Sequence, residues 1–306
     1  MGQRALALIL NGLGFLNDRL YQVEHFFKDK PIERLIAPGI AAEHLNDDVL
    51  GDLLDAIHAY GSTRLYSELA FEIGQEQNLI GGSNHLDTTT LSLFGCYEKD
   101  EKEAIENEES NPGPPEITYG HSKDHRSDLK QVTLSLTVSG KASFPLWHEA
   151  LDGKSSDKTS FHDTIAKVTE FQKQLELKEP SIWVADSALD STEKLLANSV
   201  IWITKVPETI GDAKALCQAP EDGFEWQEMG NGYRGVSLCS NYGGLPQRWL
   251  LIHSQQACER ETGTFYRKLE KIEARPKNVA SGSKIICLSS RGRICVYRTS
   301  IRDKIP

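Results

Sequence analysis

Two stretches of the chain have the residue pattern of a β-strand, and each carries one acidic residue. In residues 84–95, apolar and polar residues alternate around Asp87, which is typical of a strand with one buried face. In residues 181–187, an apolar run ends at Asp186, which suits a central strand buried on both faces. If the two strands are neighbours, their carboxylates can hold divalent metal ions between them.

The same patterns predict the rest of a sheet. Residues 132–138 alternate cleanly, and a glycine turn joins them to a strand at 143–150 as an antiparallel hairpin. A helix follows over about 157–175, a short helix over 189–197 and a further strand over 200–206. This β-β-β-α-β-α-β order describes a mixed five-stranded sheet with flanking helices, in which the first strand can lie beside the fourth.

The chain is expected to divide into four regions. Residues 1–80 read as a helical domain, with helices starting at Asn46 and Ser62. That domain is either a packing unit or a module for DNA-end recognition or dimerisation. Residues 81–206 hold the sheet, interrupted at 98–116 by an acidic, proline-rich insert that we expect to be disordered. A β-rich insertion with a charged helix at its end follows at 207–277, and 278–306 is a basic tail expected to be irregular.

Net charge, cysteine spacing and hydropathy limit what kinds of partner and location the chain is expected to have. The net charge of −10 argues against an indiscriminate nucleic-acid binder, although residues 275–306 carry eight basic residues and one acid. The six cysteines show no C-x-x-C pair, which favours reduced thiols and a cytoplasmic location. The apolar run at residues 5–10 is too short for a signal peptide or a membrane span, so we expect no membrane association.

A charged segment before the 132–138 strand supplies further candidate residues. His121 and His125 have the i, i+4 spacing of a helical zinc pair, but the surrounding Gly, Ser and Asp favour a loop. The loop either contacts DNA phosphates or is a solvated charged turn. The candidates for DNA binding are His121, Lys123, His125, Arg126 and Lys130.

Several motifs occur in one order along the chain and resemble those of DDE-type transposases of bacterial insertion sequences, in the insertion-sequence-four-like superfamily. The first motif surrounds Asp87, the second is the charged segment, the third follows the hairpin, and the fourth surrounds Asp186. In residues, these are His85-Leu86-Asp87-Thr88-Thr89, Tyr119–Arg126 with Asp128–Gln131, Asp152-Gly153 with Ser156-Asp157, and Val184-Ala185-Asp186-Ser187-Ala188. The resemblance implies an RNase H-like catalytic core.

The resemblance also implies roles for these residues. Asp87 and Asp186 would be the first two members of a catalytic triad that binds two Mg²⁺ or Mn²⁺ ions, catalytic and metal-binding at once. Complete relatives would bind the terminal inverted repeats of double-stranded DNA, nick and join strands, and self-associate.

The third member in such families is a Glu on a helix after the fifth strand, and we expect it to be absent here. The glutamates at 259, 261, 270 and 273 fit better as partners of Arg and Lys on a solvated helix. We therefore expect a chain truncated at both ends, whose tail is out of frame or, alternatively, contacts DNA. The functional hypothesis is an impaired transposase, with a non-catalytic DNA-binding remnant and a metal-dependent nuclease of the same fold as alternatives.

Overall fold

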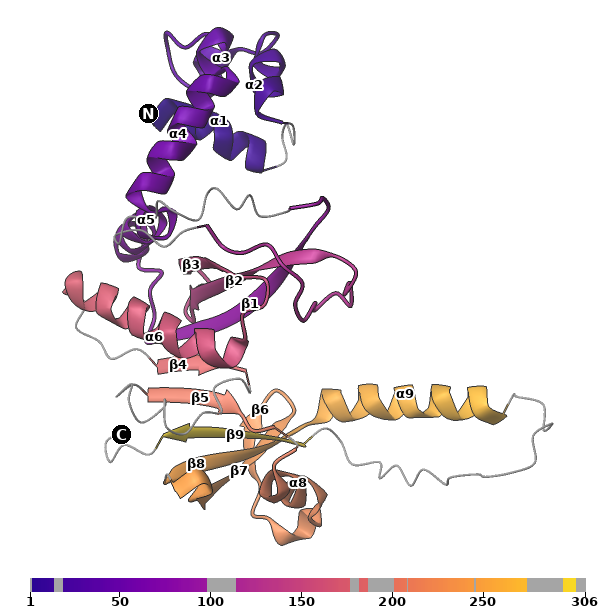
Figure 1. Ribbon diagram of the computed structural model, residues 1–306. Helices are drawn as coiled ribbons and strands as arrows, with labels where there is room; N and C mark the ends of the chain where they lie inside the picture. Colours follow the sequence, from indigo (N-terminus) through magenta and orange to yellow (C-terminus); the bar gives the residue numbers. More distant parts are fainter. Residues whose placement is uncertain are drawn as a thin grey trace. The chain divides into compact units, whose positions relative to one another are not determined.

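The computed structural model describes residues 2–13, 19–97, 114–176, 182–186, 201–207, 209–244, 246–273 and 294–300 (Figure 1). Most of the acidic insert predicted at 98–116, and the helix predicted at 189–197, lie outside these residues. The chain divides into two compact units. One comprises Met1–Ile73, Gly95–Pro115 and Leu146–His148, and the other comprises the rest. Each unit is described by itself.

The first unit is built from short helices, as the sequence predicts. Its elements are α1 (Gly2–Gly12), α2 (Leu20–Phe27), α3 (Ile32–Leu35), a 3-10 helix (Ala42–Leu45), α4 (Asp47–Tyr60) and the start of α5 (Ser62–Glu76). Asn46 caps α4, because its Oδ1 accepts a hydrogen bond of 2.9 Å from the Val49 amide. Val23, Phe27 and Leu45 are buried at the centre of this unit and give it an apolar core of its own.

The second unit contains most of the mixed sheet expected of an RNase H-like core, and only Leu146–His148 of its third strand are grouped with the first unit. Its strands β1 (Ser83–Leu93), β2 (Lys130–Ser139), β3 (Pro145–Leu151), β4 (Ile182–Ala185) and β5 (Ile201–Lys205) lie in the order β3-β2-β1-β4-β5. β1 is antiparallel to β2 and parallel to β4, and β4 is parallel to β5. The first strand thus lies beside the fourth, which confirms the predicted topology.

The sheet continues beyond β5 to nine strands through the insertion. The further elements are α8 (Gly211–Gln218), 3-10 helices at Glu221–Gly223 and Tyr242–Gly244, β6 (Gln227–Gly230), β7 (Tyr233–Ser240), β8 (Gln247–Ser254), α9 (Gln255–Glu273) and β9 (Ile294–Ser300). The charged helix predicted at 255–272 corresponds to α9, which begins directly after β8 (Figure 1).

The tail departs from the prediction of an irregular segment over 278–306. Residues 294–300 form β9, which pairs antiparallel with β5 on one side and with β8 on the other. Without β9, the facing edges of β5 and β8 would have unpaired backbone N–H and C=O groups, and β9 forms hydrogen bonds with both strands. Ile, Val, Tyr and Thr in this segment favour a strand. The prediction of an irregular tail gave weight to its basic residues and overlooked this preference.

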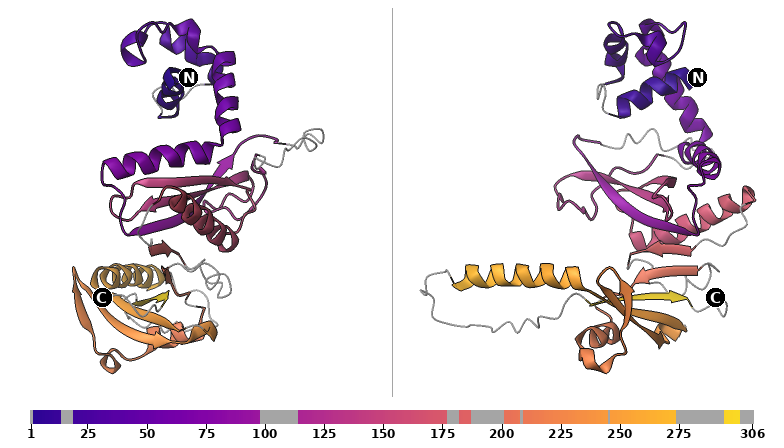
Figure 2. Two further views of the ribbon diagram at one scale, coloured as in Figure 1. Left: turned by 90° about the vertical axis from the view of Figure 1, so that its left-hand side faces the viewer. Right: turned by 180° about the vertical axis from the view of Figure 1, so that it is seen from behind.

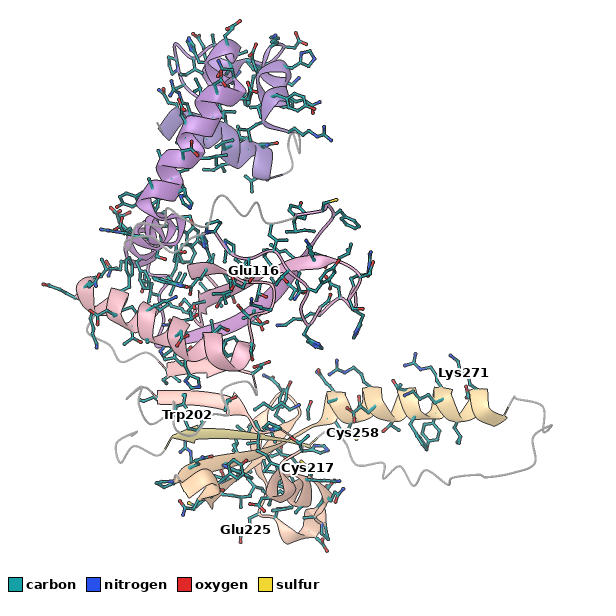
Figure 3. All side chains as sticks on the ribbon, viewed as in Figure 1. Glu116, Trp202, Cys217, Glu225, Cys258 and Lys271 are labelled. Atoms are coloured by element: carbon teal, nitrogen blue, oxygen red, sulfur yellow. The ribbon has the colours of Figure 1, made fainter. Side chains whose placement is uncertain are left out.

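Two tryptophans hold β4 in the centre of the sheet. Trp183 of β4 and Trp202 of β5 are register partners, and they are only 1% and 3% exposed. Figure 3 labels Trp202 on β5. α6 (Asp157–Gln174) lies against the sheet (Figure 2). It buries Phe161, Ile165 and Val168, and its Lys167 pairs with Glu149 of β3. Because β4 has only four residues, these large buried side chains supply much of what keeps it in place.

β1 has one buried face and one open face. Its buried row includes Asn84, Leu86 and Thr88, whereas His85 and Asp87 on the other face are exposed. Small polar side chains also fill the buried row of β2, and its aliphatic row is half-buried. Asp87 therefore stands on an accessible sheet surface.

In the parts of the chain that the structure describes, no helix is long and apolar enough to cross a membrane.

The insertion has an apolar core of its own, and a buried histidine lies on one of its strands. Trp249 and Leu251 of β8 are buried with Val206, and His253 on the same strand is only 5% exposed. Burial lowers the pKa of His253, and the nearby Arg234 guanidinium lowers it further. His253 is therefore neutral in the folded state at neutral pH.

We predict that His253 makes the second unit less stable in mild acid. Below the ordinary histidine pKa of about 6.5, the unfolded chain binds a proton that the folded chain resists, so stability falls as the pH drops through this value. Thermal unfolding of the wild type and of His253→Gln, followed by circular dichroism between neutral and mildly acidic pH, measures this. The variant should lose less stability on acidification, and equal losses would contradict the prediction.

Candidate active site

The register of β1 and β4 brings the two predicted acids to adjacent positions. Ser83 to Leu86 pair with Ile182 to Ala185. The residues that follow the last pair are Asp87 on β1 and Asp186 directly after the end of β4. Register partners on neighbouring strands, which lie about 4.8 Å apart, share one face of the sheet. Both acids are exposed, and the side chain of Asp87 is 81% exposed.

Local contacts hold the backbone at both acids. Asp87 Oδ1 accepts a hydrogen bond of 2.8 Å from the Thr88 amide. On the other strand, the Thr204 hydroxyl of β5 donates to the carbonyl of Asp186, directly after the end of β4. The second acid is thereby tied to the sheet although it lies beyond its strand.

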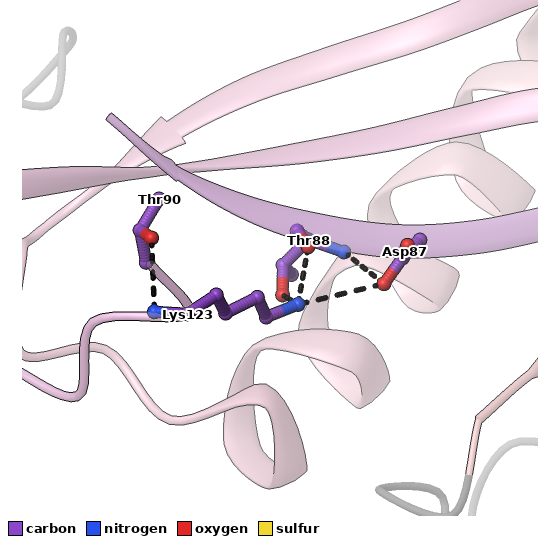
Figure 4. A network of polar contacts seen from close by, with 4 residues as sticks. All are labelled: Asp87, Thr88, Thr90 and Lys123. Atoms are coloured by element: carbon purple, nitrogen blue, oxygen red, sulfur yellow. Dashed lines mark hydrogen bonds and ion pairs between the residues drawn. The ribbon is translucent and has the colours of Figure 1, made fainter. Parts of the chain in front are cut away.

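Lys123 lies beside the first acid (Figure 4). Its ammonium donates to the Thr88 carbonyl and, at 2.9 Å, to the Thr88 hydroxyl, and its Nζ lies 3.6 Å from Asp87 Oδ1. The Lys123 amide also donates to Thr90 Oγ1 at 3.3 Å. Main chain and side chain of Lys123 are therefore both anchored to β1.

This anchorage has a cause in the sheet. β4 pairs with β1 only as far as Leu86, whereas β1 continues to Leu93. From Asp87 onward, one edge of β1 therefore has no strand partner in the described residues, and its carbonyls need other donors. The loop that carries Lys123 supplies one of them.

Residues on both sides of the loop fix its position. Thr118 and Gln131 form an isolated β-bridge, and Gln131 Nε2 donates to the Gly153 carbonyl at 2.7 Å. The Gly153 amide in turn donates to the Glu116 carbonyl at 2.9 Å. A Cβ on Gly153 would overlap the carbonyl oxygens of Gln131 and Thr118, so this close approach requires glycine.

Arg126 forms an ion pair with Asp128 of the same loop. Its Nε and Nη2 each donate to the carboxylate of Asp128 at 2.8 Å, and its guanidinium lies 5.7 Å from the ring centre of Phe94. The hydrogen bonds from Arg126 lower the pKa of Asp128 to about 2. The pair is solvent-exposed, so it organises the loop more than it stabilises the fold.

The remaining candidates lie elsewhere on the loop and at the start of β2. His121 and His125 are exposed, the loop is not helical, and His125 adopts a left-handed conformation with φ 58°. Lys130 is the first residue of β2, opposite Leu93. The structure thus brings Lys123 to Asp87, and it leaves the helical geometry of a His121–His125 zinc pair unformed.

The donor set fits a hard divalent cation with two protein ligands. Magnesium sites commonly use one or two carboxylates and complete their coordination with water and substrate phosphates. Among the described residues, no group of three or more His, Cys, Asp or Glu side chains is placed to hold a metal ion. Glu259, Glu261 and Glu270 are exposed on α9.

Comparison with known proteins gives one family match and two structural similarities. A family described as a domain of unknown function, DUF4277, matches residues 1–71. No curated protein matches the chain. The chain is similar to the piggyBac transposase in its synaptic complex with hairpin DNA, with a TM-score of 0.41 and 10% identity over 99% of this chain and 52% of that chain.

The second structural similarity is to the Mos1 transposase paired-end complex with left transposon end. Its TM-score is 0.25 and its identity 8%, over 67% of this chain and 58% of that chain. The chain thus spans little more than half the length of either transposase chain. At these TM-scores, the fold assignment comes from the strand order and register alone.

Sequence reasoning missed the residues that support the site. Thr88, Thr204 and Gln131 look like ordinary strand positions, yet they anchor Lys123, Asp186 and Gly153 respectively. The Asp152-Gly153 motif was visible in the sequence, but its partners lie more than twenty residues away. Only the folded chain shows what this glycine contacts.

We predict that Gly153→Ala destabilises the second unit by about 1–3 kcal/mol, because the new methyl group must displace two backbone carbonyls. Gly211→Ala is the matched control, since a Cβ there would meet no atom within 4 Å. Chemical denaturation of both variants measures the effect. Equal stability of the two variants would show that the loop does not depend on this close approach.

Proposed function

We propose that this chain is a DNA transposase by descent, and that Asp87 and Asp186 hold Mg²⁺ or Mn²⁺ for phosphoryl transfer on DNA. The observation that supports the proposal is the β1–β4 register, whose last pair, Leu86 with Ala185, comes directly before the two acids. Two exposed carboxylates side by side repel each other, and a divalent cation relieves that repulsion. The motifs around both acids add the resemblance to insertion-sequence transposases.

Each part of the site has a defined task in this proposal. Bound divalent ions supply activation of a water or a 3′-hydroxyl and stabilisation of the leaving oxygen in an in-line displacement. Asp87 and Asp186 provide the oxygen ligands. Thr204 holds the backbone of Asp186 in position, and the pinned loop keeps Lys123 beside Asp87.

The accessible position of the acids suits a polymeric substrate. Asp87 lies on the open face of a central strand, so a DNA backbone can approach without an enclosed pocket. The proposed substrate is double-stranded DNA carrying the inverted repeats of the element ends. Self-association is part of the proposal, because cutting two ends of one element calls for two active sites.

A second candidate function is a non-catalytic DNA-binding remnant. It is favoured by one observation, which is that the described residues contain no group of three metal-ligating side chains. A metal-dependent nuclease on the same fold is the third alternative, and it would cut DNA without preference for element ends.

We predict that the chain nicks DNA carrying the inverted repeats that flank its coding sequence, in the presence of Mg²⁺ or Mn²⁺. Asp87→Asn and Asp186→Asn should each lower the nicking rate at least about a hundredfold, since each removes one charged metal ligand. Asp163→Asn, at an exposed position on α6, is the control and should keep the wild-type rate.

The outcomes separate the candidates. Binding of the repeats without nicking by any form of the chain would favour the remnant. Nicking of repeat and unrelated DNA at equal rates would favour the nuclease. Nicking that survives both substitutions would rule out the proposed site.

A further inference from the structure

The ammonium of Lys123 occupies a position that bears directly on metal binding. It lies 3.6 Å from Asp87 Oδ1 and is fixed there by the carbonyl and hydroxyl of Thr88 (Figure 4). A long lysine side chain on an exposed loop ordinarily moves among many conformations, at a cost in entropy when it is fixed. Here two oxygens of one strand residue hold it at the acid.

A cation at this position opposes a divalent metal ion. Its charge already neutralises Asp87, and it repels any further cation that approaches the same carboxylate. Metal binding at Asp87 therefore requires Lys123 to give up part of its contact with the acid or to have its charge neutralised by another group. With only two protein carboxylates, the metal also needs oxygen ligands from elsewhere.

A DNA phosphate meets both requirements. A non-bridging phosphate oxygen between Lys123 and the acids can accept from the ammonium and also coordinate the metal ion. The side chain of Lys123 is 38% exposed and that of Asp87 is 81% exposed, so this space is open to a DNA backbone. The anchor on Thr88 keeps the ammonium in place while the phosphate arrives.

We propose that Lys123 is a substrate-positioning residue that couples metal loading to DNA binding. In the DNA-free protein its ammonium neutralises Asp87 and weakens divalent metal binding. When DNA binds, a backbone phosphate pairs with the ammonium, releases Asp87 to the metal and supplies a further ligand. Metal and DNA then bind cooperatively. This inference rests on the proposed function, because it assumes that Asp87 is a metal ligand.

The test is a direct measurement of Mn²⁺ affinity by electron paramagnetic resonance of the free ion. It is made with and without a short duplex carrying the inverted repeat, and the Mn²⁺ bound by DNA alone is subtracted. In the wild type, DNA should tighten Mn²⁺ binding at least about fivefold. Lys123→Met should tighten Mn²⁺ binding about fivefold without DNA. The gain from DNA should shrink by the same factor, because in the DNA-bound wild type a phosphate has already neutralised the opposing ammonium.

Three further variants make the result specific. Lys123→Arg retains the charge and should keep most of the coupling. Lys173→Met removes an ion-paired lysine on α6 and should behave as the wild type. Asp87→Asn should lose Mn²⁺ affinity with and without DNA. Circular dichroism melting of each variant confirms that it is folded.

The two hypotheses fail in different ways. If Asp87→Asn binds Mn²⁺ as the wild type does, or if the wild type binds none, the proposed metal site is wrong and the coupling falls with it. If Asp87→Asn lowers the affinity but folded Lys123→Met and Lys123→Arg both match the wild type, the metal site stands and the role of Lys123 is overturned.

Discussion

The parallel pairing of β1 with β4 is the constraint on which the rest of the site depends. Four consecutive register pairs, from Ser83 with Ile182 to Leu86 with Ala185, align the next residue of each strand. A slip of one position would turn one acid to the opposite face, because side chains alternate along a strand. The buried Trp183 resists such a slip of β4, since it would exchange its buried position beside Trp202 for the open face.

The unequal lengths of the two strands create the setting for the charged loop. β4 ends where the acids begin. Beyond that point the Lys123 ammonium donates to the Thr88 carbonyl of β1, and the Lys123 amide donates to the Thr90 hydroxyl. A single feature, the early end of β4, thus explains why Asp186 lies at a strand end and why a cation lies beside Asp87. Two contacts attach this loop to the β2–β3 hairpin. They are the bridge between Thr118 and Gln131 and the close approach of Gly153 to both residues.

The helical first unit and the β-rich insertion have separate apolar cores. DUF4277 matches residues 1–71, within the part of the chain that forms helices, whereas the candidate site belongs entirely to the second unit. The β-rich insertion joins the main sheet through β9, which pairs with β5. The basic tail therefore contributes to the architecture through backbone hydrogen bonds, a role independent of its charge.

Much of the fold could be predicted from the sequence, because strand alternation, helical spacing and the Asn46 cap are local signals that survive in the folded chain. The same signals placed Asp87 and Asp186 on strands and Lys123 in a loop. The burial of polar rows on β1 and β2, the strand at 294–300, and the anchoring of Lys123 by Thr88 were beyond the sequence. Each of these depends on which distant segment lies alongside, and that is decided only when the sheet assembles and every edge carbonyl must find a donor.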